Sequence, residues 1–99
     1  MTRNILLVGI LSAAFLTPVQ AQEPTNTQLI AYNCFVCHGE NGQSRGRVPK
    51  LNGFPANYIE SMMKAYKSGE QKGSIMNRIA KGYTDEEIAA IARFFSQQK

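Results

Sequence analysis

The sequence of 99 residues contains no tryptophan, a single histidine and only two cysteines. One histidine leaves few ways to build a metal site or an acid–base catalytic centre, and two cysteines are too few for a disulfide-dense scaffold. The chain also lacks an apolar run of the roughly 20 residues that span a membrane as a helix. With 43% hydrophobic and 18% charged residues it is not a disordered tail, and its length predicts at most one domain.

Residues 1–21 have the three parts of a secretory signal peptide. Arg3 provides the positive start, residues 5–16 form the apolar middle, and Val19-Gln20-Ala21 resembles a small-residue cleavage site. The alternative is a buried N-terminal core helix. We expect residues 1–21 to be removed on export to the periplasm, and residues 22–99 to form the mature domain, with no membrane span.

A domain of this size buries only a modest core, so it usually needs a disulfide, a metal, a cofactor or a partner for stability. A bridge between Cys34 and Cys37 would close a very short loop and constrain little of the chain. The sequence therefore predicts that a larger group holds the fold together.

The spacing of apolar residues predicts an all-α domain with no strand. We expect a short helix over residues 25–33, a glycine-rich loop over 39–53, a helix over 56–68 that ends at Gly69, and a helical turn over 77–81.

The last helix has the strongest pattern. Thr84 and Glu87 have the spacing of a capping box at its start. Its apolar residues recur at i, i+3, i+4 and i+7 and predict one core-facing stripe: Ile88, Ile91, Ala92 and Phe95.

Cys34, Cys37 and His38 form a Cys-x-x-Cys-His motif, which is the attachment signature of a c-type heme. In such a site the two thiols bind the porphyrin covalently and the histidine coordinates the iron. A structural zinc site would need four ligands, and a thioredoxin-like pair would need a βαβ setting. A structural disulfide would leave the small core unexplained. The motif predicts one covalent heme c.

A methionine is the expected ligand on the other heme face, because the chain has no second histidine. Met76 lies in a Gly/Ser-rich segment that can bend over the heme, and we expect it to be the distal ligand. Met62 and Met63 are the alternatives, but they lie at core spacing in a predicted helix, where methionine is usually filler.

The loop after the motif contains Pro49 and Leu51. A ligating histidine normally donates its other N–H to a carbonyl or carboxylate, and the Pro49 carbonyl is a suitable acceptor. The alternative is that Pro49 merely shapes a turn. We expect Leu51 to pack on the porphyrin in either case.

These motifs together resemble the class I bacterial c-type cytochromes, on Cys34 to Gly39, Pro49-Lys50-Leu51, Met76 and the last helix. Residues 54–83 are similar to the cytochrome subunit of flavocytochrome c sulfide dehydrogenase. The resemblance implies a small all-α fold around one heme with His38 and Met76 as ligands. It also implies an FAD-containing flavoprotein partner in a heterodimer that oxidises sulfide. Many such subunits carry two heme domains, whereas this sequence has one motif.

A heme with both axial positions filled passes single electrons and binds no substrate, so we expect an electron-transfer subunit that is not an enzyme by itself. A freely diffusing periplasmic carrier is the alternative, and a heme sensor is a third class that Met76 disfavours. The net charge of +4 comes from scattered basic residues. They predict either a solvated surface or a ring that attracts an acidic partner, and no nucleic acid.

Overall fold

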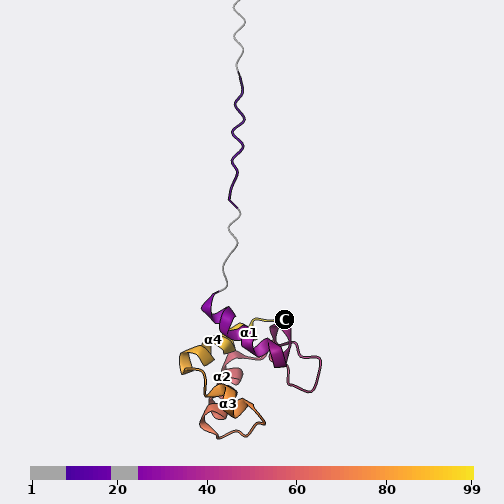
Figure 1. Ribbon diagram of the computed structural model, residues 1–99, viewed down its shortest axis with the longest axis vertical. Coiled ribbons are helices and arrows are strands. Elements are labelled where there is room, and N and C mark those ends of the chain that lie inside the picture. The colour runs from indigo at the N-terminus through magenta and orange to yellow at the C-terminus, as the bar shows by residue number, and fades with distance from the viewer. Residues whose placement is uncertain (1–8, 19–24) are drawn as a thin grey trace, which may run out of the picture.

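A computed structural model describes residues 9–18 and 25–99 (Figure 1). Four α-helices and one 3-10 turn follow one another in the described chain: α1 (Asn26–His38), η1 (Glu40–Gly42), α2 (Ala56–Ser68), α3 (Met76–Ala80) and α4 (Asp85–Ser96). These residues form no strand, so the prediction of an all-α fold is confirmed.

The predicted signal peptide falls partly outside the described residues, which include only 9–18 of its length. Those residues form no helix, and their large apolar side chains Ile10, Leu11, Phe15 and Leu16 are exposed. Residues 9–18 therefore contribute no buried core helix in this structure. Within the described ranges, no helix combines the length and the apolar character that crossing a membrane requires.

Helix α1 begins with a capping box, in which Thr25 and Gln28 each accept a hydrogen bond from the other's backbone N–H. The sequence predicted a helix over residues 25–33, whereas α1 continues through both cysteines. The prediction was too short because the ring of Phe35 packs against two aromatic rings of α4, which stabilises the additional turn. Gly39 then ends the helix with a φ of 84°.

The other helices follow the sequence pattern closely. Helix α2 spans the predicted residues and ends at Gly69, whose φ of 86° lies in the left-handed region that favours glycine. Helix α3 begins one residue earlier than predicted, at Met76. The capping box of α4 is present, with the Glu87 N–H donating to the Thr84 hydroxyl at 3.1 Å.

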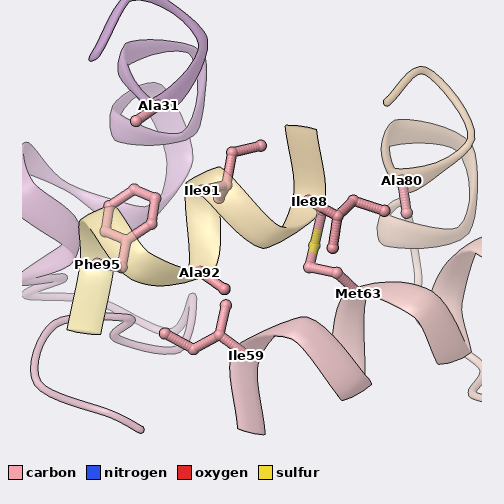
Figure 2. Packing of buried hydrophobic residues seen from close by; sticks show 8 residues of the cluster. All are labelled: Ala31, Ile59, Met63, Ala80, Ile88, Ile91, Ala92 and Phe95. Carbon is pink, nitrogen blue, oxygen red and sulfur yellow. The ribbon is translucent and has the colours of Figure 1, made fainter. Parts of the chain in front are cut away.

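Helix α4 packs against α1 and α2, while α2 also packs against α3 (Figure 1). All four apolar residues predicted for its inner face are buried. The core formed by the described residues is small (Figure 2) and consists of Ala31, Ile59, Met63, Ala80, Ile88, Ile91, Ala92 and Phe95.

A buried glycine joins the loop after α1 to this core. Gly42 has a φ of 74°, and its carbonyl accepts hydrogen bonds from the N–H groups of Leu51 and Asn52. A Cβ atom on Gly42 would lie 2.8 Å from the Phe95 ring and 2.9 Å from the Leu51 Cβ. The loop can therefore close over the end of α4 only with glycine at this position.

We expect Gly42→Ala to lower the free energy of unfolding by about 2–4 kcal/mol, since it adds both backbone strain and overpacking. Denaturant unfolding of the heme-loaded protein measures this effect. The matched control is Gly46→Ala, because a Cβ on Gly46 meets nothing within 4 Å. It should change stability by less than about 0.5 kcal/mol. Equal effects of the two substitutions would contradict the assignment.

Candidate heme site

A cavity of about 580 Å³ opens between α1, the 47–51 loop, α2 and the segment that leads into α3. Its walls are mainly apolar, with contributions from Ile59 and Tyr66 of α2 and from Ile79 of α3. All six residues that the sequence assigned to the site line this one cavity: Cys34, Cys37, His38, Pro49, Leu51 and Met76.

The extra turn of α1 determines how the motif faces the cavity. Cys34, Cys37 and His38 are spaced i, i+3 and i+4 on a continuous helix, so their side chains lie on one face. The two cysteines form no disulfide, and Cys34 is partly buried while Cys37 is exposed. The helix therefore presents two thiols and one imidazole to the same space.

The surroundings of Cys34 disfavour the reactive thiolate form of its side chain. Burial, and secondarily the neighbouring Cys37, raise the pKa of Cys34 to about 11. Reactive thiols in Cys-x-x-Cys oxidoreductases have a lowered pKa, because the thiolate is the nucleophile. A neutral thiol at neutral pH argues against a thiol–disulfide exchange site.

The imidazole of His38 is oriented by the loop that follows it. The Nδ1 atom lies 2.6 Å from the carbonyl oxygen of Pro49, which confirms the hydrogen bond predicted from the sequence. A carbonyl can only accept, so Nδ1 carries the proton and donates it to this bond. In a neutral imidazole this leaves the lone pair on the other ring nitrogen, Nε2, as metal coordination requires.

Ser44 holds this loop with two further hydrogen bonds, one of them to the backbone of His38. The Ser44 N–H donates to the His38 carbonyl at 2.8 Å, and the Ser44 hydroxyl donates to the carbonyl of Val48. Leu51 is held by the bond from its N–H to Gly42 and packs against the core as it lines the cavity.

Three methionines line the cavity, and their surroundings differ. Met63 is only 8% exposed, and Figure 2 shows it reaching toward Ile88 of α4 within the core. Met62 is partly buried in the middle of α2, whereas Met76 is the first residue of the short helix α3. The packing of Met63 fits a structural role, and the choice of Met76 as distal ligand stays a prediction.

The donors present fit a heme rather than a closed metal site. Within residues 9–18 and 25–99, no three His, Cys, Asp or Glu side chains come together to hold a metal ion, as a structural zinc site would require. A large apolar cavity lined by two thiols, one imidazole and thioether sulfurs instead matches the ligand set of a cytochrome c.

Sequence reasoning missed how much of the wall comes from aromatic residues. Tyr58, Tyr66 and Tyr83 line the cavity together with Phe54. The helical spacing of residues 58–66 assigned this face to the core. The sequence offered no separate signal for this role, because aromatic residues at helical spacing also fit a core-facing helix.

Comparison with known proteins identifies relatives of the chain. The family model for cytochrome c matches residues 26–99. Cytochrome c-554(548) of Halomonas halodenitrificans is 43% identical over 70 residues, which cover 67% of this chain and 84% of that relative. Cytochrome c-553 of Helicobacter pylori is 31% identical over 101 residues, which cover both chains in full.

A third relative carries a more specific name. The cytochrome subunit of sulfide dehydrogenase of Chlorobaculum tepidum is 38% identical over 68 residues, which cover 69% of this chain but 62% of that relative. The family match includes the motif, the loop and all four α-helices. The chain therefore belongs to the cytochrome c family and is a monoheme electron carrier with covalently bound heme c.

Proposed function

We propose that Cys34 and Cys37 hold the heme covalently, that His38 and Met76 are its axial ligands, and that the chain passes single electrons. The observation that carries the proposal is that these four side chains line one cavity, with His38 already oriented by Pro49.

The chain's own residues explain why the site transfers electrons and catalyses nothing by itself. When bound, the heme supplies a one-electron couple. His38 and Met76 would hold the iron from opposite sides, which would leave no position for a substrate. The mainly apolar walls and a methionine ligand would both favour the reduced state of the heme, and so would raise its reduction potential.

We also propose that the electron donor is the FAD-containing flavoprotein of a sulfide dehydrogenase, with this chain as its cytochrome subunit in a heterodimer. The similarity of residues 54–83 and the relative in Chlorobaculum tepidum support this assignment. A freely diffusing carrier is the second candidate, since cytochrome c-554(548) is at least as similar and its name mentions no dehydrogenase.

The proposed location is the periplasm, where bacterial class I c-type cytochromes typically reside. Residues 1–21 would act as the signal peptide and be removed. The exposed apolar side chains within residues 9–18 support a segment that is not part of the fold.

Purification under native conditions, followed by reduction with sulfide, tests the donor and the location together. We expect a flavin absorbance band to accompany the heme bands, and sulfide to reduce the heme only when the flavoprotein is present. The mass of the purified chain should correspond to residues 22–99 plus one heme. If the cytochrome purifies without flavin, and the flavoprotein does not accelerate its reduction, the free carrier is the better description.

The charge at the cavity mouth gives a sharper test of docking. Lys50 is exposed, lines the cavity and lies 5.8 Å from the centroid of the Phe54 ring. We expect Lys50→Glu to slow association with an acidic partner up to about tenfold at low salt, and the effect to fade at high salt. Arg93→Glu is the matched control, because Arg93 is exposed on α4 and does not line the cavity. Equal slowing by both would point to net charge rather than a docking site.

A further inference from the structure

We propose that Asn77 is a positioning residue for Met76, because its side chain ties the start of α3 to the end of α2. This inference rests on the proposed function, in which Met76 is the distal ligand. Asn77 directly follows Met76 in the chain, and the side chain of Asn77 forms hydrogen bonds with three backbone groups.

The amide of Asn77 uses both of its donors and one acceptor. Its Nδ2 donates to the Tyr66 carbonyl at 2.9 Å and to the Gln71 carbonyl at 2.7 Å, while its Oδ1 accepts from the Gly73 N–H at 2.9 Å. The partners set the orientation of the amide, since two carbonyls must face the NH₂ group. One side chain thus connects α3 to the last turn of α2 and to two points of the loop between them.

The start of α3 has no side-chain cap of its own. The helix has five residues, and its N-cap residue, Ile75, makes no side-chain capping bond. Ile75 is also 55% exposed. A single uncapped turn is unstable by itself, so its position depends on tertiary contacts. Met76, the first residue of this turn, packs against the core, and the hydrogen bonds of its neighbour Asn77 add a second restraint on its backbone.

The loop has further hydrogen bonds, but they join it to α2. The Gln71 N–H donates to the Ala65 carbonyl, and the Ser68 hydroxyl donates to Ala65 and accepts from the Glu70 N–H. Among the side-chain hydrogen bonds of residues 25–99, those of Asn77 are the ones that join the loop to α3. The hydrogen bonds that join the loop to α2 and those that Asn77 makes can therefore be removed by separate substitutions.

The close approach of the loop to α2 supports the same arrangement. A Cβ atom on Gly73 would lie 2.9 Å from Cε1 of Tyr66, whose ring lines the cavity. The same hypothetical atom would lie 3.5 Å from the Met76 Cβ. Asn77 therefore holds the loop in contact with both the cavity wall and the proposed ligand.

If Asn77 positions Met76, loss of its hydrogen bonds should let the Met76 sulfur leave its position more often. A competing ligand such as imidazole can bind the oxidised iron only after the sulfur has moved away. At saturating imidazole, the binding rate reports how often the site opens. Removing the hydrogen bonds of Asn77 should raise this rate without changing the ligand atom, the Met76 sulfur.

The test compares stopped-flow imidazole binding to heme-loaded variants. We expect Asn77→Ala to raise the saturating rate by about tenfold or more, and to weaken the sulfur-to-iron charge-transfer band. Asn77→Asp keeps the shape and the acceptor for Gly73 but loses both donors, so it should show a similar increase if Asn77→Ala fails to fold. Ser68→Ala is the matched control, since it removes two hydrogen bonds on the α2 side of the loop.

The outcomes separate this inference from the assignment of the ligand. If both Asn77 variants bind imidazole at the rate of Ser68→Ala, the positioning role is overturned while Met76 keeps its assignment. If Met76→Ala itself retains the charge-transfer band, the ligand assignment fails and the role of Asn77 fails with it. Faster binding in the Asn77 variants alone supports the proposal.

Discussion

Replacing both Cys34 and Cys37 with alanine should yield a protein that holds no covalent heme and does not fold stably. The two thiols are the proposed attachment points, and the cavity that they line measures about 580 Å³. Without the heme, the mainly apolar walls of this cavity would face water, which removes much of the burial on which so small a domain depends. Because a small domain is stable by only about 5–15 kcal/mol, we expect this loss to unfold it.

Two measurements check this expectation. Acid–acetone extraction should leave heme on the wild-type chain and none on the double variant, and circular dichroism should show lost helix content in the variant. The single variant Cys37→Ala is the control, because it retains one attachment point. Heme that extracts freely from the wild-type protein would refute covalent attachment.

The second large effect is expected for Met76→Ala. Loss of the thioether should abolish the sulfur-to-iron charge-transfer band of the oxidised protein and open the iron to added ligands. The reduction potential should fall by a substantial part of the range of about 0.8 V that axial ligands set. Absorbance spectroscopy and a redox titration measure both changes.

Two methionines in the same cavity serve as controls. Met63→Ala should cost about 2–5 kcal/mol of stability, because Met63 is buried against α4, yet it should keep the band. Met62→Ala should also keep it. If the band disappears in either control and persists in Met76→Ala, the distal ligand lies on α2.

The sequence allowed accurate prediction of elements whose ends are marked locally. Helix α4 was predicted from Thr84 and Glu87, and α2 from the glycine at position 69, since a capping box and a left-handed glycine act within a few residues. The end of α1 was missed because it depends on Phe35 contacting α4, which is distant in the chain.

The same distinction applies to the site. The motif predicted Cys34, Cys37 and His38 as site residues from spacing alone, and all three line the cavity. The hydrogen-bond acceptor for His38 could be predicted because Pro49 follows in the next loop. The role of Asn77 could not be predicted, since its hydrogen bonds reach back to Tyr66 across a loop. Nothing in a Met-Asn pair specifies those partners.

The hydrogen bond from His38 ends on a main-chain oxygen, and this affects how the site can evolve. Every amino acid carries that carbonyl, so no point mutation at position 49 deletes the acceptor directly. A substitution can weaken the bond only by displacing the loop. Substitutions at position 49 should therefore change the orientation of the His38 ring little. Substitutions of residues that shape the loop, such as Ser44 and Gly42, should change it more.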